Sequence, residues 1–442
     1  MTVTGTSATV GVDPVDQLRD WLEESWDPDL TVGEWWERLG LAGWANPILP
    51  AECFGRGLSR GDVVRVSSEI ARFGALGAPV GIGLNLAAPT IATHGTPEQI
   101  DAYIPDIVTG RMAWCQLFSE PGAGSDLAGL ATRAVKDGDV WIVNGQKVWT
   151  SGGHLADLGM LLARTNPEAP KHQGITWFVL DMHQPGVEVR PLREMTGQTA
   201  FSEVFFTDAV VPDRARIGDT NNGWTVANTT LAFERSGMGA GGGAAAARRG
   251  ALAARPGTVA RDLHKRAGDL VRRPSAVPVE RAKPPSPAQP YINLARETGR
   301  ITDPVIRQQL AQAHILGTLT RLTAERHKAV RAAGGDIPGV PNFSKLLMAH
   351  ILRHNRDLGM DLLGARGTLH AYDSGGRADL ASEVGGLAAM EITAQALGAQ
   401  ALPIFGGTDQ IQRNIIGERV LGLPKEPGDL AQVPFNQLPK NG

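Results

Sequence analysis

Helix-like and strand-like patterns occupy separate parts of this 442-residue chain. Before about residue 110, apolar residues recur at helical spacing, for example at Val63, Val66 and Ile70. Short β-rich runs then follow one another from about 111 to 216, and helical spacing returns after Gly223. A doubly wound parallel sheet would need strands and helices that alternate along the chain. The sequence therefore predicts a mostly helical protein with a β domain in its middle.

The middle part contains the clearest strand signals. Asp139–Val143 and Gln146–Thr150 flank the pair Asn144–Gly145, and an Asn-Gly pair supplies the positive φ angles of a tight hairpin turn. The sequence thus predicts a hairpin that turns at Asn144–Gly145. Further strands are expected at Ile175–Leu180, Val187–Val189 and Val204–Phe206.

These patterns predict a helical region at 1–110, a β region at 111–217 and a helical bundle at 218–442. Residues 248–300 stand apart in the bundle, because they carry twelve Lys or Arg against four Asp or Glu. Within them, Pro274–Pro290 contains six prolines and cannot form a helix. The segment is interpreted either as a solvated surface excursion or as a basic cover for a polyanionic ligand such as a nucleotide tail.

Charge and composition exclude several classes of protein. The formal net charge is −3, whereas a general nucleic-acid binder needs a strongly basic face. Cys53 and Cys115 are too few for a disulfide scaffold or an iron–sulfur site, and they fit a reducing cytoplasm. Phe73–Pro97 carries no charged residue over 25 positions, but its prolines, glycines and polar residues favour a buried core helix over a membrane span. We expect a cytoplasmic protein whose residues 1–14 form a disordered leader without a targeting signal.

Two motifs look like known binding sites but lack their context. Gly237, Gly239 and Gly242 form a GxGxxG string that follows a helical run instead of a strand, so close helix packing explains it better than a dinucleotide site. His350 and His354 lie four residues apart without the glutamate of a zinc-binding HExxH helix. We expect neither a Rossmann site nor a metal site.

The strongest signal is the loop Phe118–Asp126, which reads Phe-Ser-Glu-Pro-Gly-Ala-Gly-Ser-Asp. Its proline and glycines predict a tight, irregular turn whose backbone amides can face a ligand. Gly124 and Ser125 would let a planar or phosphorylated group approach closely. By itself the loop could be a plain turn between strands, but Trp149–Ser151 and the motifs near the C-terminus indicate a binding site.

Three separated motifs resemble those of the acyl-CoA dehydrogenases. They are Ser119–Asp126, Asn144–Lys147 before Trp149, and Phe405–Gln412 followed by Arg413–Arg419. The resemblance runs from about residue 60 to 425 and is broken by the basic segment. It implies an N-terminal helical domain, a β-barrel-like middle domain and a C-terminal four-helix bundle. It also implies FAD, an acyl-CoA thioester substrate and a homo-oligomer, either a tetramer or a dimer, with a hetero-oligomer as a further possibility.

For the cofactor, the resemblance assigns contacts to positions in several motifs. These are Phe118, Ser119, Gly124, Ser125, Trp149, Ser151, Arg296, Thr408 and Gln410. Ser125 would also lie near the pantetheine of CoA, and Thr408 and Gln410 would open a helix whose free amides suit anionic groups. Arg296 matches an arginine that reaches the FAD phosphates of a neighbouring subunit. Asp361 departs from the family, in which glutamine often occupies this flavin-contacting position.

The catalytic base is the most informative departure from the family. Most members carry a glutamate where this chain has Gly406, and glycine has no side chain to accept a proton. Isovaleryl- and long-chain-type members carry the glutamate on an earlier helix, at a position that matches Glu234. Gly406 would then contribute its backbone N–H to the thioester carbonyl, and Arg235 would orient the substrate.

The helical pattern around Glu234 supports this assignment from the residues alone. The positions that share its helix face are Trp224, Ala227, Leu231 and Met238. A carboxylate on that apolar face would be costly without a role, and burial should raise its pKa toward the working pH of a general base. The alternative is a structural ion pair of Glu234 with Arg235 or with an arginine of the bundle.

The resemblance thus implies FAD-dependent α,β-dehydrogenation of an acyl-CoA to the trans-2-enoyl-CoA. Glu234 would take the α-proton, flavin N5 the hydride, and an electron-transfer flavoprotein the electrons. Because Gly406 replaces a side chain, the sequence allows branched, long or polycyclic acyl groups, including a steroid side chain. Two alternatives stay open: a structural partner subunit of a mixed tetramer, and a flavin oxidase or monooxygenase on the same fold.

Overall fold

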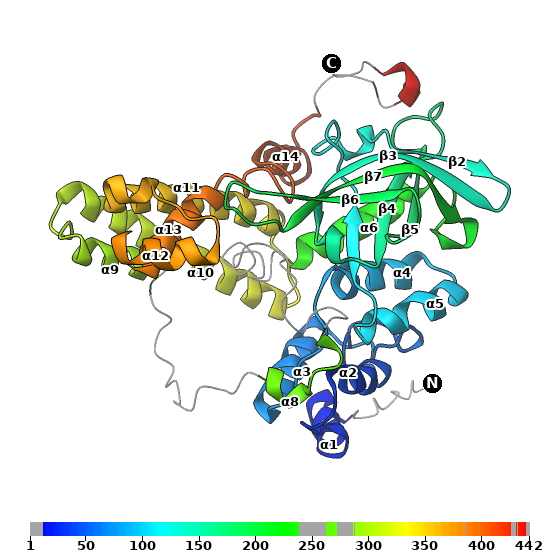
Figure 1. Cartoon of the computed structure of the whole chain (residues 1–442), viewed down its shortest axis with the longest axis horizontal. Helices are drawn as coiled ribbons and strands as arrows, with labels where there is room; N and C mark the ends of the chain where they lie inside the picture. The colour runs from blue at the N-terminus through cyan, green and yellow to red at the C-terminus, as the bar shows by residue number, and fades with distance from the viewer. Residues whose placement is uncertain are drawn as a thin grey trace, which may run out of the picture.

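The computed structural model describes residues 12–237, 262–271, 286, 288–384, 386–425, 430 and 432–438. Helices form the N-terminal part, a β-sheet the middle and a helical bundle the C-terminal part, which extends sideways from the other two (Figure 1). The predicted order of helices, strands and helices is therefore confirmed. The domain boundaries at 110/111 and 217/218 stay predictions.

Four of the five described N-terminal α-helices follow a residue whose side chain caps their first turn. The elements are α1 (Pro14–Ser25), α2 (Val32–Leu41), η1 (Ala51–Cys53), α3 (Arg60–Phe73), η2 (Gly83–Ala87), α4 (Ala88–His94) and α5 (Pro97–Val108). Thr31 and Glu34 cap each other's backbone at the start of α2, and Thr96 and Gln99 do so at α5. Each of these pairs satisfies backbone N–H groups that would otherwise lack a partner.

The uncharged stretch Phe73–Pro97 is not one buried helix, so this prediction was wrong. Residues 75–81 are non-helical, and η2 and α4 follow them. Pro79 interrupts the stretch because proline lacks a backbone N–H, and the neighbouring glycines weaken helix formation further. The expectation of burial holds for the helical part, where Leu86 and Ile91 belong to the core.

Eight strands of the described residues form one sheet. They are β1 (Trp114–Leu117), β2 (Arg133–Asp137), β3 (Val140–Ser151), β4 (Leu158–Arg164), β5 (Ile175–Asp181), β6 (Val187–Leu192), β7 (Phe201–Pro212) and β8 (Arg216–Ile217). Their order is β6-β7-β3-β2-β4-β5-β8, and β1 pairs with β4 in parallel. The three single strands predicted after residue 170 coincide with β5, β6 and β7.

The predicted hairpin turn at Asn144–Gly145 was wrong, because both residues lie inside β3. The chain turns earlier, between β2 and β3, where Gly138 has a φ of 57°. Asn144–Gly145 instead forms an irregularity opposite β7, and the Asn144 side-chain amide donates to Asp208 at 2.8 Å. A Cβ at position 145 would lie 2.4 Å from Thr132 Oγ1. Glycine is therefore needed for close strand packing, not for a turn.

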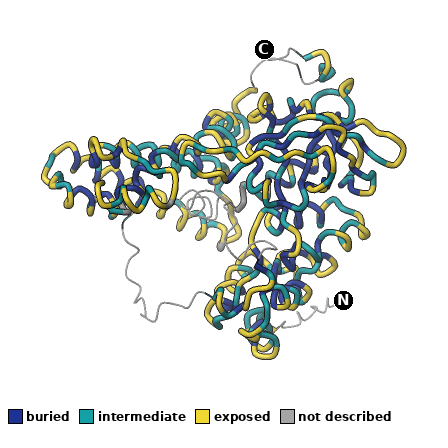
Figure 2. Tube along the Cα trace, in the orientation of Figure 1, coloured by how far each residue is buried: buried dark blue, intermediate teal, exposed yellow. Residues whose placement is uncertain are grey.

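The C-terminal bundle has a hydrophobic core of its own. Its elements are α9 (Gln289–Glu297), α10 (Pro304–Ala332), α11 (Val340–Leu363), η8 (Gly364–Thr368), α12 (Ser374–Val384), α13 (Leu387–Gly398), α14 (Asp409–Ile415) and η9 (Ile416–Val420). The short η10 (Phe435–Gln437) lies instead beside the sheet, where its backbone bonds to Ala169. Tyr291, Leu358 and Met390 belong to this core. The N-terminal helices and the sheet share a second core, which includes Trp35 and Trp177. Figure 2 shows buried positions along both of these regions.

Helix α6 (Gly223–Gly237) joins the sheet to the N-terminal helices. It packs against β5, η2 and α4, and its Val226 and Ala227 lie in the core shared by those two regions. The hydroxyls of Thr90 on α4 and Thr230 on α6 lie 3.0 Å apart, and both residues are fully buried. Helix α6 is thus held on three sides.

One part of the basic segment 248–300 also packs on the N-terminal region. Residues 262–271, which include α8 (Ala267–Leu270), lie beside the α1–α2 connection, where the backbone N–H of Val32 donates to the carbonyl of Lys265 at 2.8 Å. Ala267 is fully buried there. This part is therefore not a solvated excursion, while residues 248–261, 272–285 and 287 lie outside the described residues.

Glu69 on α3 supports a prediction about stability and pH. Its side chain is 7% exposed. Hydrogen bonds from Arg72 lower the pKa of Glu69 from 4.5 to about 2; burial opposes this change, and Arg19 adds to it. Glu69→Gln should therefore lower the free energy of unfolding at pH 7 by about 1–2 kcal/mol. The charged form stabilises the fold above the unfolded pKa, and this contribution is lost as pH falls from about 4.5 to about 2.

Urea unfolding of both proteins between pH 7 and pH 2 measures this difference. The gap between wild type and Glu69→Gln should narrow across that window. Glu188→Gln is the control, because Glu188 and its partner Arg190 are both exposed. A gap that stays constant down to pH 2 would contradict the assignment of the lowered pKa to Glu69.

Candidate active site

The loop Phe118–Asp126 forms a tight turn after β1. Glu120 and Ala123 exchange two backbone hydrogen bonds, of 3.0 and 3.1 Å. Gly124 and Ser125 are exposed beyond this turn, and a Cβ at position 124 would meet no atom within 4 Å. Space for a ligand is therefore open above Gly124 and beside the Ser125 hydroxyl.

The start of this loop is held against β3. Phe118 is buried, and its carbonyl accepts a hydrogen bond from Lys147 Nζ at 3.0 Å. The carbonyl of Ser119 accepts from the backbone N–H of Val148 at 2.9 Å. The loop and the residues before Trp149 thus form one unit, although about thirty residues separate them in sequence.

Trp149 has an unusual backbone and an exposed ring. Its φ is +60°, a left-handed conformation that bulky side chains rarely adopt, and it lies where the pairing of β3 with β7 shifts between Lys147 and Thr150. The side chain is 61% exposed and meets Phe201 edge-on at 5.9 Å. Ser151 follows and is half-buried. A flat apolar face next to a hydroxyl suits a planar aromatic ligand with a polar edge, and strain of this kind is typical of functional sites.

Glu234 lies on α6 close to the start of the same loop. Its side chain is half-buried, and Gln116 Nε2 on β1 donates to Glu234 Oε2 at 3.5 Å. On the helix face that the sequence predicts to be apolar, Ala227 is buried and Leu231 is half-buried. The carboxylate is therefore neither in open solvent nor in the core, so a ligand can reach it. The side chain of Arg235 lies outside the described residues, as does Met238.

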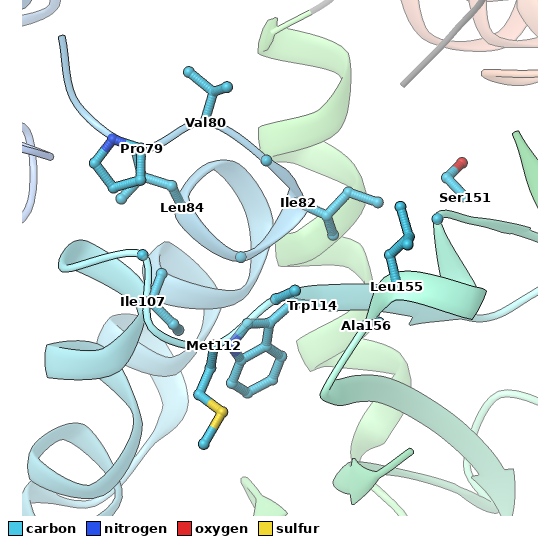
Figure 3. Close-up of a pocket in the computed structure, with 15 residues that line it drawn as sticks. Pro79, Val80, Ile82, Leu84, Ile107, Met112, Trp114, Ser151, Leu155 and Ala156 are labelled. Carbon is cyan, nitrogen blue, oxygen red and sulfur yellow. The ribbon is translucent and has the colours of Figure 1, made fainter. Parts of the chain in front are cut away.

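A small apolar cavity of about 90 Å³ lies between the N-terminal helices and the sheet. Figure 3 shows Ile82 and Leu155 across the cavity, Trp114 on one wall and Ser151 at its edge. The indole Nε1 of Trp114 is buried without a hydrogen-bond partner. A slot of this kind, next to a residue predicted to contact the cofactor, can receive part of an apolar group.

The other predicted site residues lie on the C-terminal bundle. Thr408 caps α14 with its own hydroxyl, which accepts from Ile411 N at 3.2 Å, and Gln410 is exposed. The carbonyl of Gly406 accepts from Gln412 Nε2 at 2.8 Å. Arg296 is exposed on α9. The structure thus places the loop, Trp149, Ser151 and Glu234 around the sheet. Arg296, Gly406, Thr408 and Gln410 lie instead on the bundle, which has a separate core.

Asp361, the departure from the family on α11, also has partners within the bundle. Its carboxylate accepts from Gln309 Nε2 at 3.0 Å, and its backbone carbonyl accepts from Arg300. Asp361 therefore links α11 to α10 and to the end of α9.

Sequence reasoning missed Gln116 and, apart from Ser151, the residues that line the cavity. The cavity walls come from residues 79–84, 107–114 and 151–156, which are far apart in the chain. Gln116 lies in a strand and has no spacing relation to Glu234. The available signal for the cavity was the charge-free stretch Phe73–Pro97, with glycines on both sides of Ile82. The sequence pattern there favours a buried core helix, not a cavity wall.

Two features of the described residues bear on ligand classes. Their His, Cys, Asp and Glu side chains do not gather into any group of three or more that could hold a metal ion. Over the same residues, none of the helices combines the length and the apolar character needed to cross a membrane.

The fold defines a class of protein in which a central β domain lies between an N-terminal helical region and a C-terminal helical bundle. Residues 14–111, 115–209 and 289–421 match the profiles described as acyl-CoA dehydrogenase N-terminal, middle and C-terminal domain. The chain therefore belongs to the acyl-CoA dehydrogenase family.

Individual relatives agree with this assignment. The chain is 38% identical to acyl-CoA dehydrogenase FadE34 of Mycobacterium tuberculosis over 88% of its own length, but it spans only 46% of that protein. It is 36% identical to acyl-CoA dehydrogenase IpdE1 of the same organism and covers 88% of it. Among solved structures, the ChsE4–ChsE5 complex of M. tuberculosis contains a chain with 26% identity and a TM-score of 0.61, and the match covers 95% of this chain and all of that one.

Proposed function

We propose that this chain catalyses the FAD-dependent α,β-dehydrogenation of an acyl-CoA thioester. The position of Glu234 is the single observation that carries the proposal: a half-buried carboxylate on α6, next to β1 and to the loop that begins at Phe118. Membership of the acyl-CoA dehydrogenase family supports the reaction class, because all three family domains are present.

The residues near the sheet fit a flavin. The exposed ring of Trp149 offers a flat face, the open backbone at Gly124 allows close approach, and the hydroxyls of Ser119 and Ser151 offer hydrogen bonds to a polar ring edge. The buried hydroxyl of Thr150, between Trp149 and Ser151, has no hydrogen-bond partner within the protein. When bound, the flavin accepts the hydride from the β carbon.

The remaining contacts of the cofactor are assigned from the family motifs. Phe118 would line the ring site, and Thr408 and Gln410 would hold anionic groups at the start of α14. Arg296, exposed on α9, would reach the FAD phosphates of a neighbouring subunit. Arg296 can make this contact only if the bundle lies against a second subunit.

Glu234 is the proposed base for the α-proton. A carboxylate on the substrate face opposite the flavin can remove this proton while the thioester carbonyl is polarised by hydrogen bonds. The backbone N–H of Gly406 is the proposed donor to that carbonyl, Arg235 the proposed orienting group, and Ser125 a contact of the CoA pantetheine. Gln116 donates to Glu234 and helps to fix the direction of its carboxylate.

The proposed substrates are branched, long or polycyclic acyl-CoA thioesters. Ile82, Trp114 and Leu155 give the cavity beside Ser151 an apolar lining, which suits such groups. An anaerobic panel of straight, branched and ring-bearing acyl-CoA thioesters, scored by bleaching of the flavin absorbance, tests both reaction and substrate class. Bleaching by none of them would refute the proposed reaction, and bleaching by short straight chains alone would refute the substrate class.

An oligomer and an electron-transfer flavoprotein are the proposed partners. The separate bundle with exposed Arg296, and the complex formed by the similar ChsE4–ChsE5 proteins, support a homo- or hetero-oligomer. The same complex supports a second candidate role for this chain, that of a structural partner subunit. The flavin spectrum of the chain purified alone separates the two roles, because a colourless protein would favour the partner role.

A further inference from the structure

A buried ion pair lies beneath the loop that carries the proposed FAD contacts. Lys147 Nζ on β3 lies 2.7 Å from Glu120 Oε1, and the side chains of Lys147 and Glu120 are 0% and 8% exposed. Lys147 also donates to the carbonyl of Phe118 at 3.0 Å. The ammonium group thus joins the side chain and the backbone of the loop's first turn to β3.

Glu120 ties the same turn to the residues just before β2. Its two oxygens accept from the backbone N–H groups of Ala131 at 2.7 Å and Thr132 at 2.9 Å. One carboxylate therefore holds the two ends of the segment 120–131 together. Gly124 and Ser125 belong to this segment and are exposed.

Electrostatics favour the ionised carboxylate at this position. Burial alone would raise the pKa of Glu120, but the charge and hydrogen bond of Lys147, with hydrogen bonds from Ala131 and Thr132, hold this pKa below its usual value. Burial lowers the pKa of Lys147, and the charge of Glu120 opposes that change. Two apolar side chains of the same volume could stabilise the core as well as this pair does, but they would not fix the three backbone groups of Phe118, Ala131 and Thr132.

We infer that Lys147 and Glu120 are positioning residues that hold the Ser119–Ser125 loop in its FAD-binding shape. The inference rests on the proposed function for the identity of the ligand. Lys147 also lies two residues before the strained Trp149. The Lys147 side chain therefore sets the spacing between the Ser119–Ser125 loop and the Trp149 segment. Both side chains are buried beneath the loop, so the proposed role is to position the loop and not to contact the cofactor.

The test measures FAD binding to apo-protein of the full chain. Lys147→Met should raise the Kd for FAD about 10-fold or more, because the contacts on the loop are no longer held in place. Lys171→Met is the matched control: Lys171 pairs with Asp126 at the other end of the loop at 2.8 Å, but Asp126 is exposed, so the Kd should change less than about twofold. Titration with FAD, followed by tryptophan fluorescence, gives both values.

A double variant separates positioning from stability. Glu120→Gln with Lys147→Met removes both charges of the pair, and the buried Arg164 keeps its backbone acceptors, so the double variant should regain part of the urea stability of the apo-protein that Lys147→Met loses, yet still bind FAD about 10-fold more weakly than wild type. Recovery of FAD affinity together with stability would overturn the inference, because the pair would then be structural only. Native affinity in Lys147→Met would overturn it as well.

Hydrogen exchange makes the inference testable apart from the proposed function. If the wild-type chain binds no FAD, the proposed function fails. The positioning role is then read from the amides of residues 119–125, which should exchange about 10-fold faster in the double variant and at the wild-type rate in Lys171→Met. Unchanged exchange in the double variant would overturn the inference.

Discussion

Glu234→Gln is expected to lower the rate of anaerobic flavin reduction by an acyl-CoA thioester about 10³-fold or more, because general-base catalysis contributes roughly 10²–10⁴. The glutamine keeps the size and the hydrogen-bonding capacity of the side chain but cannot accept the α-proton. FAD affinity and urea stability should stay close to wild type, since the side chain is half-buried on α6 and remains able to contact Gln116. Stopped-flow absorbance at the flavin band measures the rate.

Glu203→Gln is the matched control for this variant. Glu203 on β7 is also half-buried and also accepts a hydrogen bond from a glutamine side chain, Gln146, at 3.3 Å. The control should reduce its flavin at the wild-type rate. If Glu234→Gln does so too, Glu234 is not the base, and the reaction would need another proton acceptor.

The second large effect is expected at Trp149, where two truncations should weaken FAD binding equally but differ in stability. Trp149→Gly and Trp149→Ala both remove the exposed ring, so each should weaken FAD binding about 30-fold, the equivalent of about 2 kcal/mol of stacking. The left-handed φ of +60° costs a residue with a Cβ about 1 kcal/mol more than it costs glycine. The apo-protein of Trp149→Gly should therefore be about 1 kcal/mol more stable than that of Trp149→Ala.

FAD titration and urea unfolding of the two apo-proteins measure both effects. Trp149→Phe keeps an aromatic face and should recover most of the affinity. Equal stability of the glycine and alanine variants would mean that the backbone at this position is not strained. Wild-type FAD affinity in all three variants would remove Trp149 from the proposed cofactor site.

Local signals predicted the elements well where a single segment decides the outcome. Ile175–Leu180 is apolar throughout and forms β5, which is buried along nearly its whole length. The helical spacing of Val63, Val66 and Ile70 corresponds to α3, in which Val66 and Ile70 are buried. Such patterns work because helices and strands repeat at fixed periods, so a buried face requires apolar residues at a fixed spacing in the sequence.

The two wrong predictions have different physical causes, one a contact between neighbouring segments and the other a local break in the chain. Asn144–Gly145 has the residues of a turn. However, Thr132, just before β2, occupies the space beside Gly145, and the pair forms an irregularity within β3. The stretch after Phe73 has the composition of a core helix, but a proline and glycines divide it, and part of it lines the cavity.

The order of regions, the family motifs and the candidate base at Glu234 were determined by the sequence alone, because they depend on residue type and short-range spacing. The tertiary structure decided which side chains meet: Gln116 with Glu234, Lys147 with Glu120, and Trp114 with Ser151 around one cavity. These contacts join residues from 27 to 118 positions apart, and no local pattern encodes such pairings. They arise only when strands and helices pack, since packing sets both the distance and the burial that give each pair its chemistry.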